Sequence, residues 1–291
     1  MIRLQAVLPL LLATLAGCAT TKSAAPAPGA DVATLEERIA RLEATLESNA
    51  EALAFLRKVV AQTKAQAREA EEQEHDPAAM FAVDIARDVA AGKVDGPLLA
   101  PVTIVKAFDF ACPYCQRTSS IMDELVQEYA GKVRVVYMDL VVHPDSATKA
   151  HLAACGAAKQ GKYKAFKTAA WDKAFLPYAQ TRDMSKMGED NLLAIAKDLG
   201  LDTRKLKADM NGPGCQQLIA EDMAELAKFN VNGTPAFFIN GTFIGGAMPK
   251  EVFKTIIDEK LELVEKSGAG ANYYDQVVMT EGVKQFKSAA D

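Results

Sequence analysis

Residues 101–118 read Pro-Val-Thr-Ile-Val-Lys-Ala-Phe-Asp-Phe-Ala-Cys-Pro-Tyr-Cys-Gln-Arg-Thr. The β-branched and aromatic residues in the first part of this stretch predict a buried central strand. After the two cysteines, apolar residues recur at the spacing of a helix, at Ile121, Leu125, Val126 and Tyr129. Cys112 and Cys115 therefore stand where a strand meets a helix. The unpaired N–H groups of that helix start stabilise a thiolate, so Cys112 is the predicted exchanging sulfur and Cys115 the resolving one.

A Cys-x-x-Cys pair is also half of a common zinc site, so metal binding is one alternative. Tetrahedral zinc needs four ligands, usually as two close pairs, but the chain has 3 histidines and its Cys155 and Cys215 stand alone. We therefore predict redox chemistry with no metal, and with no cofactor other than the Cys112–Cys115 disulfide itself. An inert structural disulfide is the remaining alternative.

A second motif, Val-Asn-Gly-Thr-Pro-Ala-Phe-Phe-Ile-Asn, occupies residues 231–240. Its apolar part and residues 242–245 flank Asn240-Gly241, which is a strong signal for a two-residue hairpin. Residues 133–138 form another β-rich run behind the Cys-x-x-Cys helix. A strand–helix–strand order predicts that the two strands are parallel and joined by a right-handed crossover.

The Cys-Pro-Tyr-Cys motif between its strand and helix, together with the late Gly-Thr-Pro-Ala-Phe-Phe-Ile-Asn-Gly segment, resembles the DsbA-like branch of the thioredoxin superfamily. The resemblance covers residues 80–265. It implies an α/β, thioredoxin-like fold with a helical insertion, which we place at about residues 146–230. Residues 81–85 are interpreted as a short first strand, and residues 266–291 as a C-terminal extension without an assigned role.

The resemblance also implies roles for the neighbours of the cysteines. Pro113 and Tyr114 set the helix start and tune the stability of the thiolate. Pro235 follows a cis peptide bond in a loop that faces the cysteine pair. The backbone of Thr234, just before it, pairs with an extended substrate chain. An ordinary turn at these two residues is the alternative.

In several relatives, cysteines near the positions of Cys155 and Cys215 form a second disulfide inside the insert. The resemblance implies the same pair here, and two buried free thiols are the alternative.

One position departs from the family, because many relatives carry a buried acid where this chain has Lys106. A lysine there would favour a thiolate, pair with Asp139 on the neighbouring strand, or point outward.

The N-terminus has the pattern of an export signal. Residues 1–17 carry one early arginine and then a short apolar stretch, typical of a signal peptide. A Leu-Ala-Gly-Cys tetrapeptide ends at Cys18 and matches the bacterial lipobox, so we expect cleavage before Cys18 and a lipid on its sulfur. An ordinary signal peptide or an uncleaved anchor is the alternative. Residues 18–30 would then tether the chain to a membrane of the bacterial envelope, facing the periplasm, where disulfides persist.

Residues 31–76 carry apolar residues in steps of four and three: Leu35, Ile39, Leu42, Leu46, Leu53, Leu56 and Val60. Asn49 interrupts the series as a polar core position that would fix register. So narrow a stripe predicts a coiled coil, and through it a homo-oligomer, either a dimer or a trimer. A helix folded back on its own domain and a single-helix stalk are the alternatives.

The sequence shows no basic patch of the kind that binds nucleic acid. Residues 31–76 carry 11 acidic and 6 basic residues, which accounts for the whole net charge of -5.

We predict a thiol–disulfide oxidoreductase that acts on exported, cysteine-containing proteins and works with a membrane redox partner protein. Oligomerisation favours an isomerase or reductase over a monomeric, disulfide-donating oxidase. A non-enzymatic coiled-coil lipoprotein scaffold is the alternative from a different class.

Overall fold

The computed structural model describes residues 32–290. The predicted signal peptide, the lipidation site Cys18 and the tether lie outside the described residues. The chain divides into two compact units, one that ends at Gln66 and one that runs from Ala67 to Asp291. The two motifs predicted to form the active site, at residues 112–115 and 231–240, both belong to the second unit.

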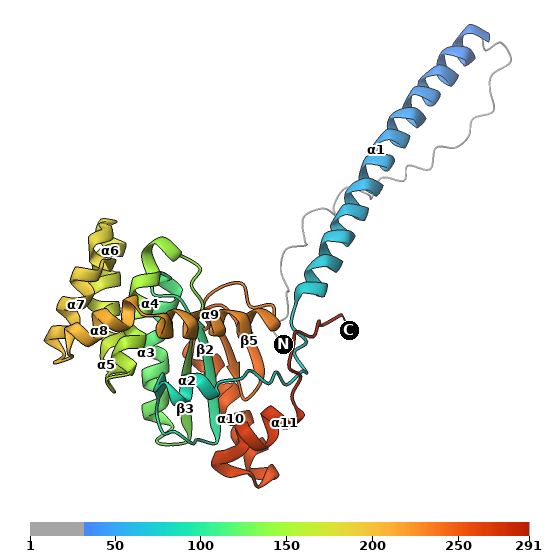
Figure 1. The fold of residues 1–291 in the computed structure, drawn as a ribbon. Coiled ribbons are helices and arrows are strands. Elements are labelled where there is room, and N and C mark those ends of the chain that lie inside the picture. Colours follow the sequence, from blue (N-terminus) through green and yellow to red (C-terminus); the bar gives the residue numbers. More distant parts are fainter. Residues whose placement is uncertain (1–31, 291) are drawn as a thin grey trace. The chain divides into compact units, whose positions relative to one another are not determined.

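Helix α1 (Val32–Gln73) is one unbroken helix of 42 residues (Figure 1). It contains the predicted heptad positions, and none of its residues is buried. The large hydrophobic side chains that it exposes include all seven heptad residues, Leu35, Ile39, Leu42, Leu46, Leu53, Leu56 and Val60. The predicted helix is therefore present, with its apolar seam open to solvent in the single chain.

The second unit is built on a five-stranded sheet of order β1-β3-β2-β4-β5. Its strands are β1 (Val94–Asp95), β2 (Val102–Phe108), β3 (Val133–Asp139), β4 (Ala236–Ile239) and β5 (Thr242–Gly245). Strands β2 and β3 are parallel, which confirms the prediction from their order, and the other pairs are antiparallel. The β4–β5 hairpin turns at Asn240 and Gly241, whose φ values of 41° and 87° are both positive, as a type I′ turn requires.

Both faces of this sheet are covered, and β2 and β3 are buried along their whole length. Alternate residues of a strand point to opposite faces, so Phe108 joins one core cluster and Ala107 the other. The first cluster includes side chains of α3 (Pro113–Glu128), α10 (Lys250–Ser267) and the insert. The second includes side chains of α9 (Pro213–Lys228) and of the C-terminal segment.

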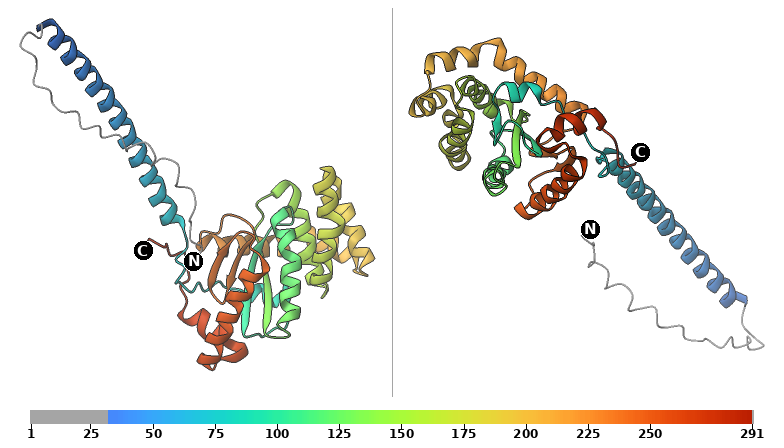
Figure 2. Two further views of the ribbon diagram at one scale, coloured as in Figure 1. Left: turned by 180° about the vertical axis from the view of Figure 1, so that it is seen from behind. Right: turned by 90° about the horizontal axis from the view of Figure 1, so that it is seen from below.

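The chain between β3 and β4 forms the helical insert. It consists of α4 (Pro144–Ala158), α5 (Tyr163–Ala170), α6 (Leu176–Thr181), α7 (Glu189–Asp198), α8 (Thr203–Asn211) and α9. A π-helical turn at Trp171–Phe175 joins α5 to α6. Figures 1 and 2 show α5 to α8 gathered to one side of the sheet. The insert thus adds a helical subdomain to the sheet without interrupting it.

The predicted strand at residues 81–85 is wrong. Phe81 forms only an isolated bridge with Val283, and the N–H of Ala82 donates to the Val283 carbonyl. The buried hydroxyl of Tyr274 donates to the carbonyl of Val83 at 2.8 Å. Four of the five residues are buried, but the run joins no strand of the sheet: besides these contacts with the C-terminal segment, the N–H of Phe81 donates to the carbonyl of Gly241. After the short helix α2 (Ala86–Ala90), β1 takes the edge of the sheet instead.

The C-terminal extension is therefore part of the core of the second unit. Tyr274 and Val278 are fully buried in the cluster that covers one face of the sheet. The extension ends, after the single turn α11 (Met279–Glu281), in backbone pairing between Ser288 and His75. The sequence could not show this, because the pairing joins residues more than 200 positions apart, near the two ends of the second unit.

Candidate active site

Cys112 caps the N-terminus of α3 with an extended backbone, φ −90° and ψ 117°. Its Sγ accepts a hydrogen bond from the backbone N–H of Cys115 at 3.4 Å. Pro113 begins the helix, where its missing N–H would have no intrahelical partner in any case. On its other side, the Cys112 thiol donates to the carbonyl oxygen of Thr234 at 3.3 Å. The sulfur is held between the start of a helix and the loop at Pro235.

The two thiols differ sharply in acidity. A hydrogen bond from the Cys115 side chain is the largest cause that lowers the pKa of Cys112, to about 5, with burial acting against it and the Cys115 and Tyr114 backbone N–H groups acting with it. Burial raises the pKa of Cys115 well above its ordinary value. Cys112 is therefore the more acidic of the two thiols, and Cys115 the less acidic. Disulfide exchange by a cysteine pair requires this difference in acidity, because one sulfur attacks first as a thiolate and the other attacks only later.

The loop opposite the cysteines contains the cis peptide bond between Thr234 and Pro235. Through the Thr234 carbonyl, this loop contacts Cys112 across 122 residues of sequence. Tyr114, in contrast, is an exposed side chain, and the Arg117 guanidinium lies 4.4 Å from its ring centre. The structure thus brings Cys112, Cys115, Thr234 and Pro235 together, with an exposed aromatic side chain at Tyr114 beside them.

Asp109, which the sequence analysis missed, holds the loops on both sides of the site. Its Oδ1 accepts the N–H of Ala111 at 2.6 Å, and its Oδ2 accepts the N–H groups of Val142 and His143 at 2.6 and 2.8 Å. The side chain is fully buried. An aspartate two residues before a turn is a known signal for a side-chain-to-backbone bond, but its reach to residues 142 and 143 is a tertiary contact.

Lys106 is buried beneath the second cysteine. Its Nζ donates to the carbonyl oxygen of Cys115 at 3.2 Å and lies 5.7 Å from the centre of the Phe237 ring. The outward orientation is therefore wrong, and so is a pair with Asp139, whose carboxylate contacts Lys93 and His151 instead. The lysine belongs to the site through Cys115.

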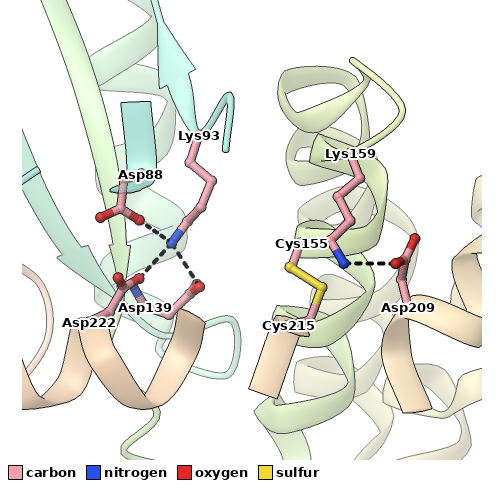
Figure 3. Close-up of a disulfide and its surroundings, with 8 residues drawn as sticks. All are labelled: Asp88, Lys93, Asp139, Cys155, Lys159, Asp209, Cys215 and Asp222. Carbon is pink, nitrogen blue, oxygen red and sulfur yellow. Dashed lines mark hydrogen bonds and ion pairs between the residues drawn. A yellow bond between two sulfur atoms is a disulfide. The ribbon is translucent and has the colours of Figure 1, made fainter. Parts of the chain in front are cut away.

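A buried charge cluster lies around Lys93 (Figure 3). Its Nζ lies 2.6 Å from Asp88, 2.9 Å from Asp139 and 2.6 Å from Asp222, and all four side chains are buried. Burial raises the pKa of Asp222 to about 8 in spite of the ammonium. At Asp139 the opposing burial is outweighed by Lys93 and His151, which lower its pKa to about 2. Through Lys93, which directly precedes β1, the cluster joins α2, β3 and α9.

Asp139 also connects this cluster to the active-site loop. Its Oδ1 lies 2.6 Å from Nδ1 of His151, whose Nε2 accepts the N–H of Phe110 at 3.2 Å. Because Nε2 accepts, the ring proton lies on Nδ1 and is donated to Asp139. Phe110 stands two residues before Cys112. Neither His151 nor Lys93 carries a local sequence motif, so only the fold reveals their positions.

Cys155 of α4 and Cys215 of α9 form a disulfide with a Cα–Cα distance of 5.8 Å (Figure 3). This is the pair that the family resemblance implies. The disulfide joins the first and last helices of the insert. Beside it, Lys159 and Asp209 form an ion pair at 2.8 Å. The Cys155–Cys215 disulfide thus has the position of a structural cross-link between α4 and α9.

Comparison with known proteins gives a family for this fold and site. A family model described as thioredoxin matches residues 88–259, which is more than half of the chain. A thioredoxin-like oxidoreductase from Silicibacter pomeroyi DSS-3 is 31% identical and superposes with a TM-score of 0.50, covering 59% of this chain and 93% of that chain. The alpha-DsbA1 of Wolbachia pipientis is 19% identical, with a TM-score of 0.52 over 60% of this chain and 93% of that chain.

The chain therefore belongs to the thioredoxin family, and its fold is similar to that of alpha-DsbA1. The predicted fold class is confirmed. Among sequence relatives, the Na(+)/H(+) antiporter NhaA of Herminiimonas arsenicoxydans is 27% identical over 165 residues, which make up 57% of this chain and 25% of the antiporter. The chain thus spans about a quarter of the length of that relative. In residues 32–290, no helix is long and apolar enough to cross a bilayer.

Proposed function

We propose that this protein is a thiol–disulfide oxidoreductase that exchanges disulfides with cysteine-containing exported proteins. The observation that carries the proposal is the contrast between the acidic thiol of Cys112 at a helix start and the buried, weakly acidic thiol of Cys115 one turn later. The Cys112 thiolate attacks a substrate disulfide to form a mixed disulfide, and Cys115 then attacks the Cys112 sulfur and releases the substrate. The relative from Silicibacter pomeroyi, a thioredoxin-like oxidoreductase, supports this class.

The loop at Pro235 supports a way to hold the substrate. The Thr234 carbonyl lies 3.3 Å from the Cys112 sulfur, so a chain that carries the reacting disulfide would pass directly along this backbone. Main-chain pairing of an extended substrate with Thr234 would work for many sequences, because backbone hydrogen bonds do not depend on side-chain identity. Such pairing suits an enzyme for many exported proteins.

Trapping of the mixed disulfide tests this function. The Cys115→Ser variant should accumulate a covalent complex with a disulfide-containing substrate, because its resolving sulfur is gone. The Cys112→Ser variant should accumulate none. A double Cys155→Ala, Cys215→Ala variant should still exchange disulfides and serves as the control. Equal trapping by Cys112→Ser, or none by Cys115→Ser, would contradict the assigned roles.

We further infer that α1 joins several copies of the chain and that the assembly works as an isomerase or reductase. The support is the open seam of α1, on which Leu42 is 63% and Leu46 is 68% exposed. Heptad residues exposed to this extent bury their apolar surface when a second copy packs against them. Several active sites around one stalk raise the effective concentration for a second attack on a wrongly bonded substrate.

Deletion of residues 31–66, which removes every heptad residue but keeps the second unit with its His75–Ser288 pairing, separates the two parts of this inference. The shortened protein should be a monomer by light scattering and should lose the ability to rescue a scrambled multi-disulfide substrate, while simple exchange remains. A full chain that is already monomeric would exclude the oligomer. Unchanged rescue by a monomeric deletion variant would reduce the helix to a spacer.

A disulfide-donating oxidase is the second candidate, and the acidity of Cys112 favours it. A pKa of about 5 stabilises the reduced, thiolate form, and a stabilised reduced form makes the disulfide a stronger oxidant. The reduction potential decides between the two. A value near −120 mV would indicate an oxidase, while a value of about −180 mV or lower would favour isomerase or reductase chemistry.

The proposed location of the protein is the bacterial envelope, where a lipid on Cys18 would anchor it to a membrane so that it faces the periplasm. A membrane redox partner protein would restore the working redox state of the Cys112–Cys115 pair. Mass spectrometry of the mature N-terminus tests the anchor. A diacylated Cys18 supports it, and an unmodified N-terminus created by cleavage elsewhere would exclude it.

A further inference from the structure

A small cavity of the second unit lies apart from the cysteine pair. It has a volume of about 420 Å³, and its lining comes from α2, the loop between β1 and β2, β3 and the C-terminal segment. Arg134 contributes from the N-terminal end of β3, whereas Cys112 follows the C-terminal end of the parallel strand β2. The larger apolar side chains of the lining are Ile85, Val89, Leu98, Leu99 and Met279.

The guanidinium of Arg134 is the basic group of this lining. The residue is 2% exposed. Its Nε donates to the hydroxyl oxygen of Thr103 at 2.9 Å, and its Nη1 donates to the carbonyl oxygen of Leu98. Arginine has five N–H donors, so three of them have no acceptor among residues 32–290. These donors are available to a ligand in the cavity.

The charge of Arg134 has no carboxylate partner. In the part of the chain that the structure describes, no carboxylate oxygen lies within 4.0 Å of its nitrogens. The other buried cations differ: Lys93 and Lys167 contact aspartates, and burial lowers the pKa of Lys106 to about 7, so that amine can lose its proton. An arginine keeps its proton in proteins. Because an uncompensated buried charge is costly, the cavity favours an anionic group beside Arg134.

Two carboxylates restrict the kind of anion. Asp84 and Asp275 also line the cavity, and both are exposed to solvent. Burial lowers the pKa of Arg134, and Asp275 acts against this from beyond ion-pair distance. Two negative charges and one positive charge around the cavity disfavour a ligand with two negative charges. A single carboxylate fits the planar donors of the guanidinium with the least repulsion.

We propose that this cavity binds a small monocarboxylate with an apolar body, such as a medium-chain fatty acid. The carboxylate would accept hydrogen bonds from Arg134, and the chain would lie against Val89, Leu98 and Met279. The volume is at the lower end of the range of about 300–1,000 Å³ for small-ligand sites, which suits one short chain. The site does not use Cys112, so the proposal does not depend on disulfide exchange.

Calorimetric titration with octanoate tests the proposal on the full chain with Cys18→Ser, which keeps a bound lipid out of the sample. Octanamide is the matched ligand, because it has the same chain and no charge. We expect one octanoate to bind per chain, and octanamide to bind at least about 10-fold more weakly, as the loss of hydrogen bonds between charged groups implies. Equal binding of the two would indicate adsorption to apolar surface and would overturn the proposal.

Arg134→Met removes the guanidinium and keeps a long apolar side chain. It should weaken octanoate binding at least about 10-fold and leave octanamide binding unchanged. Arg87→Met is the matched control, because it removes an arginine of α2 that already pairs with Glu221 at 3.2 Å and does not line the cavity. It should bind octanoate within about 2-fold of the parent protein. Parent-like octanoate binding by folded Arg134→Met, or an equal loss in Arg87→Met, would overturn the proposal.

Asp275→Lys tests the site without touching the buried guanidinium, so it applies even where Arg134→Met does not fold. Reversing an exposed charge of the lining should strengthen octanoate binding about 3-fold or more at low salt and leave octanamide binding unchanged. No gain in folded Asp275→Lys would overturn the proposal. Cys112→Ser should bind octanoate as the parent protein does, and a loss of binding there would contradict the separate location of the site.

Discussion

The disulfide between Cys155 and Cys215 makes a quantitative prediction about the stability of the second unit. The two cysteines are 60 residues apart in sequence, and both are buried. The change to test is the double substitution Cys155→Ala, Cys215→Ala in a Cys112→Ser, Cys115→Ser background. Alanine is preferred to serine at the structural pair, because two buried hydroxyl groups without partners would add their own cost.

The magnitude follows from the length of the loop that the bond closes. In the chain-entropy model, closing 60 residues lowers the entropy of the unfolded chain by about 14 cal/mol/K, which corresponds to about 4 kcal/mol at 25 °C. Loss of the bond should therefore lower the free energy of unfolding by about 4 kcal/mol. With a urea m-value of about 2–3 kcal/mol/M, the midpoint should fall by roughly 1.5–2 M.

The chain provides its own probe, because Trp171 is its only tryptophan and lies buried in the insert against Phe110. Urea unfolding followed by its fluorescence measures the insert, and circular dichroism measures the whole domain. A loss below about 1 kcal/mol, with both probes coincident, would refute the entropic argument. A loss seen by fluorescence alone would show that the insert unfolds separately from the sheet.

Further predictions concern the buried groups of the second unit. Lys93→Met should cost about 3–5 kcal/mol, because it leaves uncompensated buried carboxylates, whereas Lys173→Met, which breaks an exposed pair with Asp198, should cost less than about 1 kcal/mol; urea unfolding measures both. Asp109→Ala should cost at least about 2–3 kcal/mol, because it leaves three backbone N–H groups without their acceptor, and Asp109→Asn should cost less. Absorbance of the reduced protein at 240 nm should show ionisation of Cys112 near pH 5, and a midpoint near 8.5 would contradict its assignment as the activated thiol. Because the folded pKa of Cys112 lies below the unfolded one, its stabilisation of the reduced protein should be complete above about pH 9 and disappear as the pH falls through 5; unfolding of the reduced protein against pH measures this.

Local sequence signals predicted the elements whose conformation depends on near neighbours. The β-branched run ending at Phe108 predicts β2, and the helix after Cys112 follows from its apolar spacing and from Pro113. The hairpin follows from Asn240-Gly241, because few other pairs adopt two positive φ angles. In each case a few adjacent residues carry the information. The position of Cys112 and Cys115 at a strand–helix junction was predicted in the same way, since it is a property of consecutive residues.

Tertiary structure alone decided how those elements surround the site. Residues 81–85 have the composition of a strand, yet they pair with a C-terminal segment about 200 residues away and not with the sheet. No local sequence pattern predicts which of the two pairings forms. Lys93 reaches aspartates 5, 46 and 129 residues distant, and Lys106 meets Cys115 because the sheet and α3 pack face to face. A lysine in a sequence can lie in solvent, in an ion pair or under a thiol. Its surroundings determine whether it carries a charge, and folding brings those surroundings together from distant parts of the chain.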